Sequence, residues 1–236
     1  MNNQKPQKLY LDSSGVLSLH SIFPTIQGEA IFAGCPATFV RLGGCNLKCP
    51  MCDTEYTDNV LQVRPQYILE KVEELSAPNR LVVITGGEPF RQNLSPLVSL
   101  LLLNNFTVQI ETNGTLAPTI DKELLGNPHL KIVCSPKTGR ISPQLVDFID
   151  AYKYVIHADE IDLIDGLPNI ALGLKAGKLA RPHKYTGDVR PYRIFVQPVD
   201  VQDEIENLRH LNATIRSSMT HGYTLCLQVH KIINVE

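Results

Sequence analysis

The segment from Arg41 to Thr54, RLGGCNLKCPMCDT, places Cys45, Cys49 and Cys52 in CxxxCxxC spacing behind two glycines. Thiolates at this density are typical of zinc, copper(I) or iron–sulfur sites. A structural zinc site takes four protein ligands, whereas this loop supplies three. A [4Fe-4S] cube held by three cysteines leaves one iron without a protein ligand, and an open metal position is typical of catalysis. The segment therefore predicts a metalloenzyme.

Two other uses of the cysteines are weaker interpretations. A zinc ion would need a distant fourth ligand from Cys35, Cys134, Cys226 or one of the seven histidines. Disulfides are less favoured because 236 residues bury a core without cross-links, and the opening MNNQKPQKLY lacks the apolar stretch of a secretory signal. We therefore expect a reducing, cytoplasmic environment and interpret the three remaining cysteines as small buried apolar residues.

The composition and charge indicate which kinds of molecule the chain binds. With 43% hydrophobic and 19% charged residues, the chain is typical of a globular protein, most economically of one domain. A net charge of -2 argues against a broad surface for nucleic acid. No uninterrupted apolar run approaches the length of a membrane span. We therefore expect a small-molecule partner, and neither nucleic acid nor a membrane.

Around the cysteine loop, β-branched apolar segments alternate with stretches of helical period, which predicts repeated βα units. Strands are expected at Thr38–Leu42, Leu81–Thr85, Thr107–Glu111, Lys131–Cys134, Tyr152–Ile156, Arg193–Gln197 and Tyr223–Val229. Helices are expected at Pro65–Leu75, Leu94–Leu103 and Asp203–Arg216, the last with an apolar face made by Ile205, Leu208, Leu211 and Ile215. Right-handed crossovers favour an α/β fold with a mainly parallel sheet or partial barrel, whose functional residues lie at the carboxyl ends of the strands.

Polar residues follow four of these strands. The first group is Gly86, Gly87 and Glu88, where glycines let the backbone approach a ligand and a carboxylate accepts from an ammonium group. The other groups are Glu111 to Gly114, Ser135 with Lys137, and Gln197. Each alone is as well explained by a tight turn or an ordinary polar strand end. Because the ends of parallel strands meet at one rim, four in succession predict a shared site.

The CxxxCxxC loop followed by GGEP resembles the radical S-adenosylmethionine superfamily. Further motifs resemble the branch of that superfamily that acts on a pterin in the queuosine pathway. They are FPTIQGEA at 23–30, GCPATFVRLGGCNLKC at 34–49, CDT at 52–54, TGGEP at 85–89, ETNGT at 111–115, SPK at 135–137 and LQVHK at 227–231. The cysteine and GGEP motifs indicate only the superfamily, whereas QGE, CDT and QVHK together indicate the branch.

The resemblance implies a single radical S-adenosylmethionine domain over residues 1–236, folded as an incomplete (β/α) barrel. It implies a lyase that contracts 6-carboxy-5,6,7,8-tetrahydropterin to 7-carboxy-7-deazaguanine with loss of ammonia. Its cofactors would be a [4Fe-4S] cluster and S-adenosylmethionine, which chelates the open iron and provides the 5′-deoxyadenosyl radical that takes hydrogen from the pterin. The protein would place the reacting atoms. Magnesium, a homodimer and a flavodoxin or ferredoxin electron donor are further implications.

The resemblance also assigns residues. The cluster would be held by Cys45, Cys49 and Cys52. Contacts to S-adenosylmethionine would come from Gly86, Gly87, Glu88, Ser135, Lys137 and Gln197. The pterin would be bound by Gln27, Gly28, Glu29, Arg41, Glu111, Thr112 and His230. Arg41 would take the substrate carboxylate, because a guanidinium fork fixes both the charge and the orientation of a carboxylate.

Magnesium would be bound by Thr54, with the substrate and water completing the oxygen ligands, and Asp53 would lie outside that ligand set. Met51 departs from the aromatic residue common at its position, and a thioether fills an irregular gap beside an adenine. The segment 157–188 fits no motif and suggests a loop or insertion. Two alternatives remain open here: another radical enzyme such as a glycyl-radical activase, and a non-catalytic zinc-binding module.

Overall fold

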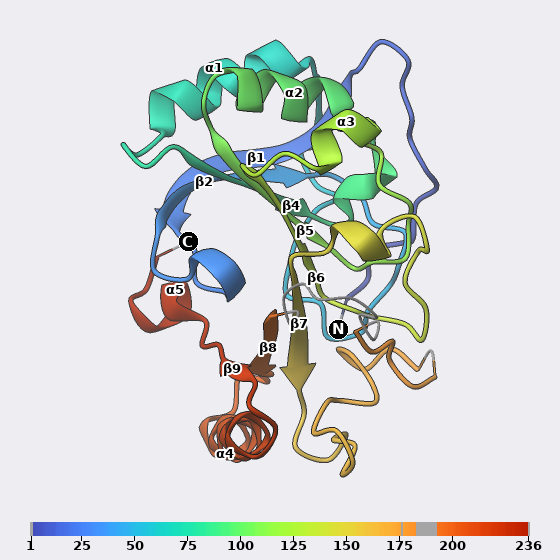
Figure 1. Cartoon of the computed structure of the whole chain (residues 1–236), viewed down its shortest axis with the longest axis vertical. Helices are drawn as coiled ribbons and strands as arrows, with labels where there is room; N and C mark the ends of the chain where they lie inside the picture. Colours follow the sequence, from blue (N-terminus) through green and yellow to red (C-terminus); the bar gives the residue numbers. More distant parts are fainter. Residues whose placement is uncertain (1, 176, 183–192, 236) are drawn as a thin grey trace.

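The structure, a computed structural model, describes residues 2–175, 177–182 and 193–235. Within these residues, one nine-stranded sheet forms the centre of the molecule (Figure 1). From edge to edge its strands are β3 (Leu61–Val63), β1 (Leu17–Ile26), β2 (Pro36–Leu42), β4 (Leu81–Gly86), β5 (Thr107–Thr112), β6 (Leu130–Cys134), β7 (Ala151–Ile156), β8 (Arg193–Pro198) and β9 (Thr224–Leu225).

The strands from β2 to β9 run parallel, whereas β1 is antiparallel to both of its neighbours. The edges β3 and β9 do not pair with each other, so the sheet is an unclosed barrel. This confirms the expected α/β fold with a mainly parallel sheet. The parallel strands direct their carboxyl ends to one rim.

Helices cover the sheet at both of its ends (Figure 1). Helices α1 (Pro65–Leu75) and α2 (Ser95–Leu103) pack on each other and on β1 and β5, and the short α3 (Lys122–Leu125) lies beside α2. Helix α4 (Glu204–His221) packs on β7, β8 and β9, and α5 (Val229–Ile232) contacts β1. Three single turns of 3₁₀-helix, η1 (Ala30–Phe32), η2 (Pro89–Arg91) and η3 (Val146–Phe148), complete the elements.

The ends of α1 and α4 follow from local sequence. Pro65 occupies the first turn of α1, where its missing N–H costs nothing. The Asp203 carboxylate accepts the N–H groups of Ile205 and Glu206 and so caps α4. Gly222 ends α4 in the left-handed region, with φ of 73°.

The sequence predicted most of the long elements correctly and missed several features, including the short helix α3. Strands β1 and β3 were not expected. The stretch Tyr223–Val229 was expected to be one strand, but only Thr224–Leu225 pairs and α5 already begins at Val229. Helix α4 continues five residues beyond the predicted end at Arg216. None of the described helices is long and apolar enough to cross a membrane.

The predicted apolar face of α4 is only partly covered, since Leu211 and Ile215 are half-buried. Ile205 is 80% exposed and Leu208 is 58% exposed, although both were expected to face the core. The helix instead buries His210, Ala213, Thr214 and Ser217. The physical reason is the position of the helix. Its buried face packs mainly on β8 and on the loop at Gly166, whose carbonyl accepts from the Ser217 hydroxyl, whereas nothing in the described chain covers the opposite face.

The central strands form the core that supports this rim. Val82, Ile84, Val108 and Ile110 on β4 and β5 are fully buried.

The cysteines outside the loop differ in burial. Cys134 and Cys226 are buried, as expected, whereas Cys35 is only half-buried. All six cysteines, which lie in the described part of the chain, are free. The segment 157–182, as far as it is described, runs as a loop without helix or strand, and the remainder of the unassigned stretch to 188 lies outside the described residues.

Candidate active site

A cavity of about 370 Å³ opens at the rim formed by the carboxyl ends of the parallel strands. The cysteine loop and α5 complete its wall. It brings together most of the residues that the sequence singled out, namely Gln27, Glu29, Arg41, Cys45, Cys49, Cys52, Thr54, Gly86, Gly87, Glu111, Thr112, Ser135, Lys137, Gln197 and His230. Gly28 and Glu88 are not part of its lining.

The three thiols of the cysteine loop are largely removed from solvent. Cys45 and Cys49 are each 8% exposed, and Cys52 is half-buried. Burial raises the pKa of all three thiols, to about 12 for Cys45. The thiolates therefore form when a bound metal compensates their charge.

The N-terminal arm, residues 2–10, lies along this loop and satisfies its backbone. The Gln7 N–H donates to the Cys45 carbonyl at 2.7 Å, and Asn2 Nδ2 donates to the Cys49 carbonyl at 3.1 Å. The Gln4 side chain donates to the Thr54 carbonyl at 2.9 Å and accepts the Tyr56 N–H at 3.0 Å. The arm had no assigned role in the sequence, because its residues match no motif.

Glycines allow the cysteine loop and the loop after β4 to pack closely against each other. A Cβ on Gly87 would lie 2.1 Å from the Gly44 carbonyl oxygen, and one on Gly86 would lie 2.1 Å from the Leu42 carbonyl oxygen. Gly86 also has φ of +127°, which side chains disfavour. The GG pair therefore lets the two loops touch through their backbones beside the cysteines.

The cysteine loop fits an iron–sulfur cube better than a zinc ion. Among the described residues, no three cysteine, histidine or acidic side chains gather closely enough to hold one metal ion. The thiolates of a zinc site all lie about 2.3 Å from one atom, whereas those of a [4Fe-4S] cube bind separate irons and stand farther apart. The three thiols share one cavity wall, and the loop supplies three of the four protein ligands that a structural zinc site takes, so the donor set favours a cluster with one open iron.

Glu88 lies behind the cavity lining, and its predicted contact with S-adenosylmethionine stays a prediction. Its carboxylate is fully buried and accepts from the Asn113 N–H and the Thr112 hydroxyl, each at 2.7 Å, and from the Phe90 N–H at 3.0 Å. Burial raises the pKa of this carboxyl. The structure therefore gives Glu88 the task of holding the turn after β5, while Gly86 and Gly87 form the cavity wall.

Lys137 and Ser135 act together at the end of β6. Lys137 Nζ donates to the Ser135 hydroxyl at 2.6 Å and to the Ser135 carbonyl at 2.9 Å. Burial lowers the pKa of the Lys137 ammonium. The pair presents a cation and a hydroxyl on the same side of the cavity as the cysteines, which suits an anionic ligand group.

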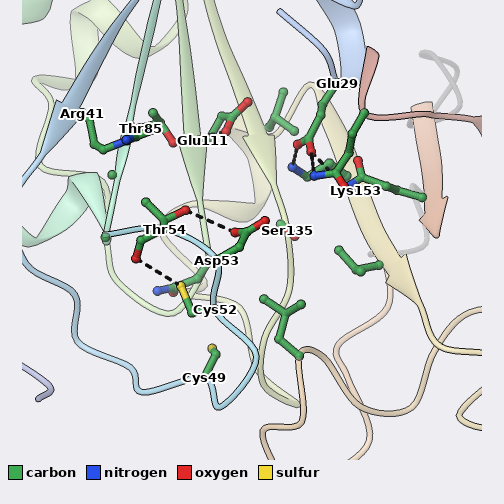
Figure 2. Close-up of a pocket in the computed structure, with 18 of the residues that line it drawn as sticks. Glu29, Arg41, Cys49, Cys52, Asp53, Thr54, Thr85, Glu111, Ser135 and Lys153 are labelled. Carbon is green, nitrogen blue, oxygen red and sulfur yellow. Dashed lines mark hydrogen bonds and ion pairs between the residues drawn. The ribbon is translucent and has the colours of Figure 1, made fainter. Parts of the chain in front are cut away.

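Two carboxylates face the cavity from separate groups of donors (Figure 2). In the first group, Glu111 accepts from Gln27 Nε2 at 3.0 Å, Gln109 Nε2 at 3.1 Å and the Thr85 hydroxyl at 3.2 Å. Gln27 in turn accepts the Glu29 N–H at 3.1 Å. The Gln27 side chain thus links the group around Glu111 to the chain segment that carries Glu29.

In the second group, Glu29 forms an ion pair with Lys153 and accepts from Gln197 Nε2 at 2.9 Å and Gln228 Nε2 at 3.0 Å. Gln197 was expected to contact S-adenosylmethionine, and the structure instead joins its amide to Glu29. Its oxygen Oε1 is buried without a hydrogen-bond partner among the described residues, which suits a donor on a ligand. Lys153 and Gln228 were missed, although a lysine inside the buried strand AYKYVI was an available signal.

Arg41, Thr54 and His230 also line the cavity. The Arg41 guanidinium lies 4.9 Å from the centre of the Phe23 ring. The Thr54 hydroxyl is half-buried and reaches the Asp53 carboxylate at 3.4 Å (Figure 2). His230, on α5, lies so close to Gly28 that a Cβ there would be 1.9 Å from its Nδ1, and burial lowers the pKa of its imidazole. Gly28 therefore contributes by making room for His230.

The comparisons with known proteins agree with this geometry. A family model described as the radical SAM superfamily matches residues 39–140. A 7-carboxy-7-deazaguanine synthase of Rhodospirillum rubrum is 42% identical, over 93% of this chain and 92% of its own. One of Rickettsia prowazekii is 38% identical, over 100% of this chain and 96% of its own. The crystal structure of QueE from Escherichia coli covers 90% of this chain and 93% of its own with a TM-score of 0.66; at 24% identity it supports the fold alone.

The fold and the cysteine loop thus define a radical S-adenosylmethionine enzyme, which uses a [4Fe-4S] cluster and S-adenosylmethionine. The similarity over nearly the whole chain is more specific than this class. The chain belongs to the 7-carboxy-7-deazaguanine synthase family.

Proposed function

We propose that this chain converts 6-carboxy-5,6,7,8-tetrahydropterin to 7-carboxy-7-deazaguanine with loss of ammonia, as a step of queuosine biosynthesis. The observation that carries the proposal is the single cavity that combines three cysteines, two hydrogen-bonded carboxylates and Arg41. When bound by Cys45, Cys49 and Cys52, the cluster together with S-adenosylmethionine would supply the one-electron chemistry that removes a hydrogen atom from the substrate and returns one after the ring contracts, so that the conversion with loss of ammonia is redox-neutral.

The chain's own residues bind S-adenosylmethionine and the pterin and orient them toward each other. Gly86 and Gly87 let S-adenosylmethionine approach the backbone, and Lys137 with Ser135 receives its carboxylate or ribose. Glu29 and Glu111 accept N–H groups of the pterin in one plane, because ionised carboxylates are acceptors only. Arg41 binds the substrate carboxylate as a bidentate fork. Holding both reactants in one cavity supplies the proximity that the reaction requires.

Magnesium belongs to the same proposal. Thr54 lines the cavity beside the cysteine loop, and its hydroxyl would be one oxygen ligand, with the substrate carboxylate and water supplying others. Asp53 is the nearest carboxylate to that hydroxyl, and we place it outside the ligand set. A calorimetric titration with Mg²⁺ in the presence of substrate, on the wild type and Thr54→Val, tests this assignment.

A second copy of the chain and an electron donor are also proposed. Ile205, Leu208 and Met219 project from one face of α4 and are 80%, 58% and 82% exposed, which supports a homodimer formed through this face. A flavodoxin or ferredoxin would reduce the cluster in the cytoplasm. Light scattering on the wild type and on Leu208→Lys tests the dimer, since the charge would leave a monomer.

The activity is tested by an anaerobic assay of the reconstituted protein with S-adenosylmethionine, reductant, magnesium and the pterin. We expect both 5′-deoxyadenosine and 7-carboxy-7-deazaguanine by mass spectrometry, and neither from Cys49→Ala. If deoxyadenosine forms without the deazaguanine, the protein carries out the radical chemistry but the pterin is not its substrate. That result would agree with the alternative of a glycyl-radical activase. Neither product from a protein with a full iron complement would reject the activity altogether.

A further inference from the structure

Lys153 is a charged residue in the interior of the sheet. It lies on β7 between Tyr152 and Tyr154, which are 0% and 1% exposed, and its own side chain is 12% exposed. Its ammonium forms an ion pair with Glu29, which is 11% exposed (Figure 2). A buried charge of this kind is costly unless it is paired, so each residue depends on the other.

The Glu29 carboxylate is held at both of its oxygens. Oε2 accepts from Lys153, and Oε1 accepts from the amides of Gln197 and Gln228. An ionised carboxylate offers about four acceptor positions, so three protein donors fix its plane and leave one position for a ligand. The carboxylate lines the cavity, which is where that ligand donor would come from.

We propose that Lys153 is a positioning residue that determines substrate specificity: by its ion pair it keeps Glu29 ionised and oriented, so that the cavity selects a ring edge carrying an amino group over one carrying a carbonyl. The inference rests on the proposed function, in which Glu29 faces the amino-pyrimidine edge of the pterin. Lys153 also lines the cavity, and the role inferred here is exerted through its ion pair with Glu29.

The charges around Glu29 support this role. His230 faces it from α5, the Cys226 thiol lies near it, and Glu111 and Lys137 act on Lys153 from β5 and from the end of β6. Lys153 is the cation in contact with the carboxylate. Burial alone would raise the pKa of Glu29. The charge and hydrogen bond of Lys153, together with the hydrogen bonds from Gln228 and Gln197, outweigh burial and lower this pKa to about 2.

Removing the ammonium therefore changes how binding depends on pH. Without it, burial raises the pKa of Glu29, and the carboxyl takes up a proton as the pH falls. A protonated carboxyl loses an acceptor position and presents a donor to the substrate amino group. Binding should weaken toward low pH in the variant and not in the wild type.

The test uses the cluster-loaded protein with S-adenosylmethionine and no reductant, so that binding is measured without turnover. Equilibrium dialysis would give the Kd of 6-carboxytetrahydropterin and of its 2-oxo analogue between pH 6 and 8.5. For Lys153→Met we expect the pterin Kd to rise at least tenfold from pH 8.5 to pH 6 beyond any wild-type trend, and discrimination against the 2-oxo analogue to fall. Lys153→Arg should restore the wild-type profile.

Three controls separate this role from a structural one. Lys131→Met removes a partly exposed pair with Asp150 at 3.1 Å on the neighbouring strand β6, outside the cavity, and should leave Kd unchanged. The double variant Lys153→Met with Glu29→Gln should lose the added pH dependence. Lys153→Gln keeps a hydrogen-bond donor and removes only the charge, and it should behave as the methionine variant does; it is used where Lys153→Met fails to fold.

A pterin Kd for Lys153→Met and Lys153→Gln that equals the wild-type value at every pH would overturn the inference. A rise by one constant factor at all pH values, with or without Glu29, would also overturn it, because that result describes a structural lysine. If the wild type itself binds no pterin but still cleaves S-adenosylmethionine, the proposed function fails instead. Thermal melting of each variant verifies that the compared proteins are folded.

Discussion

Gly28 is the residue whose role the structure changed most. It was expected to contact the substrate, but it borders the cavity only through His230, whose Nδ1 would lie 1.9 Å from an added Cβ. Gly28→Ala should displace the imidazole and raise KM for the pterin several-fold, with a small loss of stability because a side chain moves more easily than backbone. Gly126→Ala is the matched control, since nothing lies within 4 Å of its Cβ. Equal KM values for the two variants would refute the role given to His230.

Arg41 carries the most specific chemical assignment in the cavity. If its guanidinium binds the substrate carboxylate through two hydrogen bonds, Arg41→Lys should keep the charge and lose the fork. We expect KM for the pterin to rise about tenfold or more, while cleavage of S-adenosylmethionine without substrate stays unchanged. Steady-state kinetics of both reactions measure this, and an unchanged KM would remove Arg41 from the carboxylate site.

At the level of single residues, motifs predicted which side chains line the cavity better than what each one contacts. Loops rich in cysteine and glycine carry a local signal, because their chemistry requires particular residues at fixed spacing. The pairing of Glu29 with its partners carries no such signal: Lys153, Gln197 and Gln228 come from separate segments of the chain, and only the fold brings them to one carboxylate. The contact of Glu88 with the Asn113 N–H could not be predicted for a similar reason, since Asn113 belongs to the next βα unit.

Among the elements, α4 depends on its N-terminal cap. The Asp203 carboxylate accepts two backbone N–H groups, from Ile205 and Glu206, each at 3.0 Å. Asp203→Ala should lower the free energy of unfolding by about 1 kcal/mol, and Asp203→Asn should restore most of it. Denaturant titration followed by circular dichroism measures both. Equal losses for the two variants would show that the charge matters and the cap geometry does not.

The central strands were predictable because each is an apolar, β-branched run that is buried on both faces. Edge elements lacked that signal. Strand β3 has two exposed residues out of three, and β9 consists of two residues, so neither shows a period long enough to recognise. Strand β1 was not predicted because its sequence LSLHSIFPTI contains a proline, which argues against a strand. The QGE motif that follows it was interpreted as part of a binding segment.

For the whole molecule, stability in acid should depend on Glu29. Its folded pKa of about 2 lies below the ordinary value of 4.5, so ionisation of Glu29 stabilises the fold above pH 4.5, and this contribution is lost as the pH falls toward 2. The difference in unfolding free energy between the wild type and Glu29→Gln should therefore shrink over that range. Glu88, whose pKa is raised, contributes with the opposite sign but equally to both proteins. Urea titrations at several pH values measure the difference, and a constant difference would contradict it.

The whole fold brings two binding regions to one rim: the cysteine loop with its N-terminal arm, and the carboxylates Glu29 and Glu111 on neighbouring parts of the wall. For the proposed reaction, both reactants must occupy this cavity together, with hydrogen passing directly from the pterin to the cofactor.

The most direct measurement is the mass of 5′-deoxyadenosine formed from a pterin deuterated at its reduced ring carbons. We predict deuterium in the deoxyadenosine alongside 7-carboxy-7-deazaguanine, and loss of both from Cys49→Ala. Deoxyadenosine without deuterium, formed while the pterin is consumed, would show that the hydrogen comes from elsewhere and would contradict the shared cavity.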